Sequence, residues 1–162
     1  MSTTGGFTSS GLLQEELLLT LPAVDVADAI EIGEIAKSFG IQRSLPIAVE
    51  VRVGDWAVYH ASLPGSTPEN DWWIGRKARV VKLKQHSTMF ERVLAEEQGI
   101  DWHKENNLLD ETHAIHGGGL PLITKSDGLV GVLLISGLPQ VEDHLLGVEV
   151  LTEFLARKGE LL

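Results

Sequence analysis

The spacing of the apolar residues changes after the first third of the chain. Between residues 14 and 39 they recur every three or four positions, which predicts two helices separated by Pro22. After residue 47 they alternate with polar or small residues on both sides of Gly54-Asp55. Alternation around a two-residue loop of this kind is typical of a β-hairpin. Because the two strands of a hairpin run in opposite directions, the chain is expected to contain an antiparallel sheet.

A second hairpin is predicted towards the end of the chain. Residues 120–124 and the almost continuous apolar run 129–136 flank a turn at Ser126-Asp127-Gly128. A strand this apolar is expected in mid-sheet, buried on both faces. If the turn is a two-residue loop, Gly119 pairs with Ser136, beside the start of a last helix.

Helices, a hairpin, two more helices, a second hairpin and a final helix follow one another along the chain. The helices must cover the faces of the sheet, so the sequence predicts an α+β fold. We expect an antiparallel β-sheet of about five strands, including a short one at 112–115, flanked by helices in a profilin- or PAS-like layered arrangement. A length of 162 residues fits one domain, expected over 11–162 after a flexible N-terminus of residues 1–10. The first hairpin's alternation places His60 on its apolar face, as a core histidine.

Composition excludes several classes of function. The net charge of −10, from 23 acidic and 13 basic residues, repels phosphate backbones and argues against nucleic-acid partners. There is no cysteine, which excludes disulfides and thiolate catalysis. Residues 1–11 lack the basic and apolar regions of a signal peptide, and the apolar run 129–135 is too short for a bilayer span. We therefore expect no membrane partner and a cytoplasmic location.

A candidate binding site is predicted where the last two strands meet the last helix. The expected pairing brings a triple glycine against the segment that runs from Ser136 into that helix. The N–H groups of a glycine loop and of a helix N-terminus favour the anionic groups of a ligand, such as a carboxylate or phosphate. Alternatively, the glycines only allow a bulge and close packing. The candidate ligand-binding residues are His116, Gly117, Gly118, Gly119, Ser136, Asp143 and His144.

Two motifs with known chemistry are incomplete. On a helix, His113 and His116 would share a face, but the glycines that follow favour an extended segment in which the rings point apart. No third ligand is evident, so no metal site is predicted. His116 and its glycines resemble the oxyanion-hole loop of lipases, but the required Gly-x-Ser-x-Gly elbow is absent. No catalytic residue is assigned, and enzymatic activity is left open.

The helix that begins near residue 71 is a second candidate surface. Five of the 13 basic residues lie between Arg76 and Lys84. Trp72 and Trp73 would offer a flat surface for stacking, and Arg76 and Lys77 would attract an acidic ligand. The same surface could contact an acidic face of another subunit. It could also be an ordinary solvated helix face with its tryptophans in the core.

The motifs that carry most information are His116-Gly-Gly-Gly-Leu-Pro121, Ser136-Gly-Leu-Pro-Gln140, Asp143-His144 and Trp73-Ile-Gly-Arg-Lys77. Together, over about residues 15–157, they resemble the haem-degrading-domain (GlcG/HbpS-like) family, and within it the cytoplasmic branch of uncharacterised UPF proteins. The resemblance implies an antiparallel sheet flanked by helices, a higher homo-oligomer and haem as a candidate cofactor. Some members of that family bind haem, and some are reported to degrade it. By this resemblance, Trp72 or Trp73 would contact the haem face, Arg76 or Lys77 the propionates, and His116 or His144 the iron.

Two functions fit these sequence features. The first is an oligomeric small-ligand-binding domain that holds haem or another small carboxylate or anion where Gly117–Gly119 meet Ser136, with haem degradation as an associated activity. The second is a non-enzymatic homo-oligomeric assembly or adaptor module, in which the basic tryptophan helix packs on an acidic neighbour. A metal-assisted enzyme acting on a small organic acid is a weaker third, because it lacks a third metal ligand.

Overall fold

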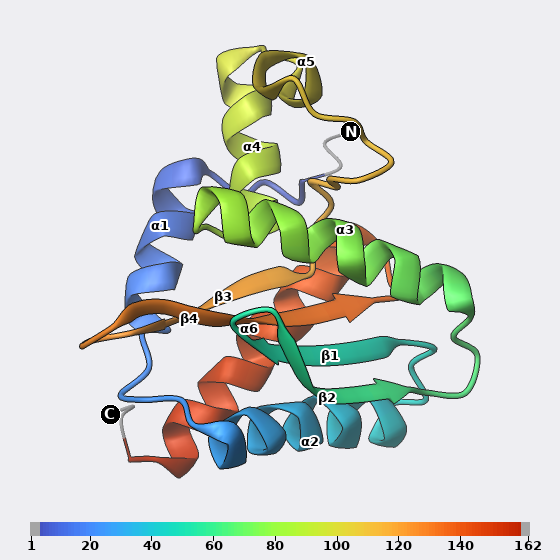
Figure 1. Ribbon diagram of the computed structural model, residues 1–162, viewed down its shortest axis with the longest axis vertical. Coiled ribbons are helices and arrows are strands. Elements are labelled where there is room, and N and C mark those ends of the chain that lie inside the picture. Colours follow the sequence, from blue (N-terminus) through green and yellow to red (C-terminus); the bar gives the residue numbers. More distant parts are fainter. Residues whose placement is uncertain (1–3, 160–162) are drawn as a thin grey trace.

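A four-stranded antiparallel sheet with the strand order β2-β1-β4-β3 forms the centre of the molecule in the computed structural model, which describes residues 4–159 (Figure 1). Its elements are α1 (Ser9–Leu18), α2 (Val26–Gln42), β1 (Ala48–Val53), β2 (Trp56–Ser62), α3 (Pro68–Lys84), α4 (Thr88–Gln98), α5 (Trp102–Asn106), β3 (Gly119–Thr124), β4 (Gly128–Ser136) and α6 (Gln140–Arg157). The predicted α+β class and the helix-flanked antiparallel sheet are confirmed.

Helices cover both faces of the sheet. Figure 1 shows α3 across one face, and α2 with α6 on the other. On the α3 face, Ala48, Val132 and Leu134 pack against apolar residues of α3. On the opposite face, Leu133 and Ile135 belong to the larger core, to which α2 and α6 contribute. Strand β4 is therefore buried on both faces, as its continuous apolar run predicts.

The strand count is four rather than about five among residues 4–159, because residues 112–115 form no strand. The N–H of Ala114 donates instead to the carbonyl oxygen of Arg76 in α3, over 3.3 Å. Helix α1 begins at Ser9, after Thr8 caps it by accepting a hydrogen bond from the N–H of Gly11 at 3.1 Å. The predicted flexible N-terminus thus overlaps this helix, and its residues 1–3 lie outside the described part.

The first hairpin has the predicted two-residue loop but a different register. A bulge follows Val51, so that Val51 pairs with Tyr59 and Glu50 pairs with His60. One extra residue moves every later side chain to the other face of its strand. The prediction that His60 lies on the apolar face is therefore wrong: its Nδ1 lies 3.0 Å from Oε1 of Glu50, on the α3 side of the sheet.

The second hairpin is also shifted, by two residues between Gly119 and Leu122 and by three residues nearer the turn. Gly119 pairs with Leu134 instead of Ser136, because the turn is longer than two residues and the register changes again after Leu122. The shift of two between Gly119 and Leu122 keeps these side chains on their predicted face. The backbone of Gly118 still meets the end of β4, since the N–H of Ile135 donates to the carbonyl oxygen of Gly118 at 2.9 Å. The predicted meeting of the triple glycine with the start of α6 is thus retained.

Candidate functional site

A pocket of about 280 Å³ lies between the first half of α3, the segment before β3 and the start of α6. Six of the predicted site residues line it: Trp73, Lys77, His116, Gly117, Ser136 and Asp143. They come from three segments that are far apart in the sequence. The convergence follows from the second hairpin, which returns the chain to the glycine segment, and from α3, which crosses that end of the sheet.

Lys77 and Asp143 form a buried ion pair in the wall of this pocket. Nζ of Lys77 donates to the carbonyl oxygen of Ile135 at 2.8 Å and to Oδ2 of Asp143 at 3.2 Å. The two side chains are only 2% and 3% exposed. The other carboxylate oxygen of Asp143 accepts the N–H of Leu138 at 3.0 Å. A backbone N–H group just before α6 is therefore already bound by a carboxylate of the protein itself.

Burial changes the acidity of both partners. It raises the pKa of Asp143 to about 6, although Lys77 and the backbone N–H of Leu138 act in the opposite direction. Burial also lowers the pKa of Lys77, against the attraction of Asp143. Both changes favour the neutral forms, so a proton can be exchanged here nearer to neutral pH than at exposed groups.

The triple glycine is required by close packing around this pair. A Cβ on Gly117 would lie 2.3 Å from the carbonyl oxygen of Gln140. On Gly118, whose φ is +125°, it would lie 2.3 Å from the carbonyl oxygen of Ile135 and 2.7 Å from Nζ of Lys77. The N–H of Gly119 donates to Oγ1 of Thr88 at 3.0 Å. The glycines thus allow the backbone to pass directly beside the ion pair.

His116 is a neutral imidazole at the edge of the pocket. Burial, with Arg92 and Lys77 nearby, lowers its pKa to about 4. Its ring contacts Trp73 edge-on, with ring centroids 4.7 Å apart, and its buried Nδ1 has no hydrogen-bond partner in the described part of the chain. The ring also lines a second cavity of about 350 Å³ that faces α4 and α5. A neutral imidazole is the form that binds metals.

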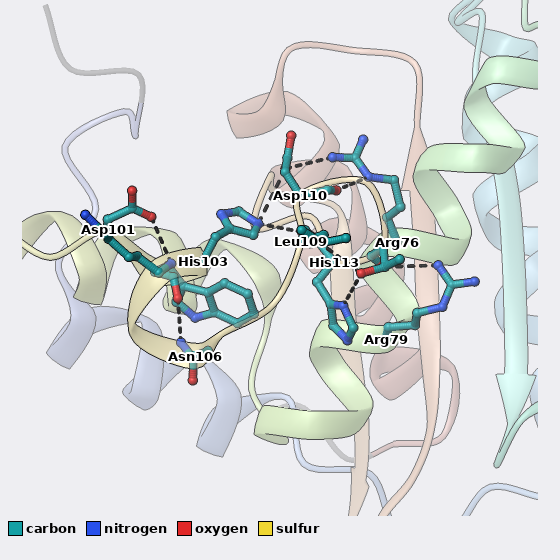
Figure 2. Close-up of polar contacts among 11 residues, drawn as sticks. Arg76, Arg79, Asp101, His103, Asn106, Leu109, Asp110 and His113 are labelled. Carbon is teal, nitrogen blue, oxygen red and sulfur yellow. Dashed lines mark hydrogen bonds and ion pairs between the residues drawn. The ribbon is translucent and has the colours of Figure 1, made fainter.

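The segment that leads to His116 is fastened to α3, as Figure 2 shows. Nε of Arg76 donates to the carbonyl oxygen of Asp110 at 2.7 Å, and Nη2 reaches Oδ1 of the same residue at 2.8 Å. Nη1 of Arg79 donates to the carbonyl oxygen of Thr112 at 3.0 Å. Nε2 of His103 contacts the carbonyl oxygen of His113 at 2.6 Å. These bonds hold the approach to His116 in place.

Five predicted site residues lie outside the pocket lining: Gly118 and Gly119, which pack beside the ion pair, and Trp72, Arg76 and His144. The guanidinium of Arg76 is enclosed between the rings of Trp72 and Trp73, at 4.1 and 4.3 Å from their centroids. Trp72 is half exposed on the outer side of this stack. His144 is buried, and its Nε2 lies 2.6 Å from Oε1 of Glu15 in α1. Adjacent helical positions diverge by about 100°, which separates His144 from Asp143.

Sequence reasoning missed the polar rim of the pocket. Asn70 was not among the predicted site residues. It acts within the cap of α3, where its Oδ1 accepts the N–H of Thr67 at 2.8 Å. Its Nδ2 also lies 3.4 Å from Oγ of Ser136. Gln140, the last residue of the Ser-Gly-Leu-Pro-Gln motif, accepts the N–H of Gly117 at 3.3 Å. The same motif could have indicated this contact.

Residues 4–159 contain neither an evident metal cluster nor a membrane-spanning helix. No group of three or more His, Asp or Glu side chains is arranged to hold a metal ion in that range. None of the helices described there combines the length and the apolar character needed to cross a membrane.

Fold and pocket together define a class: an α+β domain with a four-stranded antiparallel sheet and a polar pocket at the edge of a glycine segment. The family model described as "Haem degrading protein HbpS-like" matches residues 24–152, and the chain belongs to this family. The family resemblance of the glycine and Ser-Gly-Leu-Pro-Gln motifs is thereby confirmed.

Relatives support the assignment. A UPF0303 protein of Streptomyces avermitilis is 40% identical over 143 residues, which cover 88% of each chain. A UPF0303 protein of Streptomyces coelicolor is 34% identical, covering 91% of this chain and 94% of the other.

Solved structures share the fold. The crystal structure of Ybr137w has a TM-score of 0.82 at 25% identity, covering 91% of this chain and 88% of that one. The PduOC:heme complex has a TM-score of 0.68 at 17% identity, covering 80% of this chain and 94% of that one. At this low identity, the second likeness concerns the fold alone.

Proposed function

We propose that this chain is a small-ligand-binding domain whose ligand, haem or a small carboxylate, binds in the pocket between α3, the triple glycine and α6. The observation that carries the proposal is the convergence of Trp73, Lys77, His116 and Ser136 on one cavity. An aromatic ring, a buried cation, a neutral imidazole and a hydroxyl are a suitable donor set for such a ligand. Membership of the HbpS-like family and the haem complex of PduOC make haem the first candidate.

The residues present fit haem in part. The neutral imidazole of His116 lines the pocket and would hold the iron. Trp73 would contact the porphyrin face, and Lys77 would attract a propionate. At about 280 Å³ the pocket lies at the lower end of ligand cavities, so it would hold a small carboxylate whole and a porphyrin only by one edge. Bound haem would supply redox chemistry, while these residues bind and orient it.

Hemin titration tests the iron ligand. Wild type is expected to shift the Soret band at micromolar hemin, and His116→Ala is expected to lose this shift because the neutral imidazole is removed. His113→Ala is the matched control: it removes a histidine three residues away that lies outside the lining of the pocket. An unchanged shift in His116→Ala would remove His116 from the proposal. Loss of Soret absorbance after addition of ascorbate would report haem degradation in the same samples.

The second candidate function is a homo-oligomeric assembly module, and exposed apolar side chains favour it. On α3, Leu83 is 54% exposed and Trp72 is 49% exposed. The basic residues of α3 are a weaker argument, because Lys82 contacts Asp55 and Lys84 contacts Asn106 within the chain.

Light scattering is expected to give wild type a mass that is a multiple of 17.6 kDa, and Leu83→Glu a lower mass, because a charge would be buried in the contact. Leu17→Glu, on α1, is the control for a similarly exposed leucine elsewhere. A wild-type mass of one chain at micromolar concentration would exclude the assembly module.

A further inference from the structure

The side chain of Lys77 places a primary amine, only 2% exposed, in the wall of a cavity. We propose that the amine of Lys77 is a nucleophile that forms an imine with a small 2-oxo acid bound in the pocket. This inference rests on the proposed pocket and names a ligand class for it, but it does not depend on haem binding.

The surroundings of Nζ leave one direction available. Two acceptors contact Nζ among residues 4–159, the carbonyl oxygen of Ile135 at 2.8 Å and Oδ2 of Asp143 at 3.2 Å. A neutral amine has two N–H bonds and one lone pair, so these acceptors can hold both hydrogens and leave the lone pair unoccupied. A Cβ at Gly118 would lie 2.7 Å from Nζ. The same Cβ would lie 2.3 Å from the carbonyl oxygen of Ile135, so the glycine lets backbone pass beside the amine, and a ligand carbon must reach Nζ from the pocket that Lys77 lines.

The surroundings of Lys77 favour the neutral form of its amine more strongly than water does at an exposed lysine. Burial is the main cause that lowers the pKa of Lys77, and Arg76 acts in the same direction, while Asp143 opposes both. His116 adds no positive charge near pH 7, because its pKa is lowered to about 4. Desolvation of a lysine is one of the established ways to activate it for imine formation.

Asp143 is placed to move the proton that the reaction requires. The lone pair of Nζ attacks the carbonyl carbon, a C–N bond forms, and the carboxylate of Asp143 carries one proton from the nitrogen to the carbonyl oxygen, which becomes a hydroxyl. A second proton passes from the nitrogen through Asp143 to this hydroxyl, which leaves as water as the C–O bond breaks and the C=N bond forms. The sum is amine plus carbonyl giving imine plus water, without oxidant or reductant. A carboxyl group whose pKa is raised to about 6 can serve as acid and base in turn.

The pocket rim selects for a short monocarboxylate. Ser136 lines the pocket, and its hydroxyl accepts from Nδ2 of Asn70 at 3.4 Å, so the hydroxyl hydrogen remains to donate to a ligand oxygen. Asn70 has a second amide hydrogen for the same purpose. Glu69 also lines the pocket and would repel a second negative charge. A cavity of about 280 Å³ suits a ligand of a few carbon atoms.

Reductive trapping tests the inference in the wild-type protein. The protein is incubated at pH 7 with pyruvate and sodium cyanoborohydride, and the reduced adducts are mapped by peptide mass spectrometry. Lys82, on the same helix but 69% exposed, is the internal control lysine. We expect Lys77 to be modified at least tenfold faster than Lys82, and we expect propanal, which lacks the carboxylate, to react more slowly at Lys77.

Two variants test whether the adduct forms on Lys77. Lys82→Arg should keep the adduct, and Lys77→Arg, which retains the positive charge, should lose it. Because the wild-type peptide map is decisive by itself, poor folding of Lys77→Arg does not weaken the test. Modification confined to surface lysines would overturn the imine proposal. If hemin or a small carboxylate still binds in that case, the pocket proposal stands; Lys77 labelling without hemin binding would instead remove haem alone.

Discussion

Gly118→Ala is expected to destabilise the protein by about 3–5 kcal/mol, because the new methyl group meets backbone that cannot move aside cheaply. Its Cβ would lie 2.3 Å from the carbonyl oxygen of Ile135, which accepts the hydrogen bond from Lys77. The φ of +125° adds conformational strain for any side chain. Urea denaturation at pH 7 measures the effect as a lower midpoint with an unchanged slope.

Gly128→Ala is the matched control for Gly118→Ala. Gly128 also has a positive φ, of +69°, but a Cβ there would have nothing within 4 Å. We expect Gly128→Ala to lower the free energy of unfolding by about 1 kcal/mol, because the alanine would be strained in a left-handed conformation but would not clash. Equal losses of stability in the two variants would mean that strain alone, rather than close packing beside the ion pair, explains the glycine at 118.

The elements of this fold were largely predictable because their signals are local. The Gly54-Asp55 loop and the run of apolar residues in β4 depend on neighbours in the sequence, and both hairpins follow from them. The bulges were not predictable, because they depend on packing across the sheet. One bulge moved His60 to the other face, whereas the two-residue shift between Gly119 and Leu122 in the second hairpin left those side-chain faces unchanged.

The candidate site also combines features that the sequence predicts with features that depend on contacts between distant residues. The meeting of the glycine segment with Ser136 follows from chain topology and was predicted. The burial of Arg76 depends on Asp110, 34 residues away, and no local pattern indicates that contact. Lys77 did carry a signal: it lies three residues after Ile74 and four before Val81, both of which face the sheet. The run of basic residues hid this position, because such a run is usually read as solvated.

Lys77→Met is expected to cost about 3–5 kcal/mol at pH 7, because it leaves the carboxylate of Asp143 buried without its partner. Methionine is of similar length, so lost packing contributes little. Lys82→Met removes an exposed lysine of the same helix, whose pair with Asp55 is open to solvent, and it should leave stability unchanged. Urea denaturation of the three proteins makes the comparison.

The loss of stability caused by Lys77→Met should depend on pH. The titration of Asp143 determines whether this loss grows or shrinks as the pH rises. Asp143 titrates at 3.8 in the unfolded chain and at about 6 in the folded protein. A group with a raised folded pKa stabilises the fold below its unfolded pKa, and this contribution is lost as the pH rises through the folded pKa. Without Lys77, the folded pKa of Asp143 rises further, so the variant should lose more stability than wild type above pH 6.

Near pH 4, protonated Asp143 carries no charge in either protein, and the difference between them should be smallest. The double variant Lys77→Met/Asp143→Asn should recover part of the stability at pH 7 and lose the pH dependence, since it removes the buried charge itself. A cost of Lys77→Met that stays constant between pH 4 and 8 would show that packing, and not the unpaired carboxylate, is what Lys77 provides.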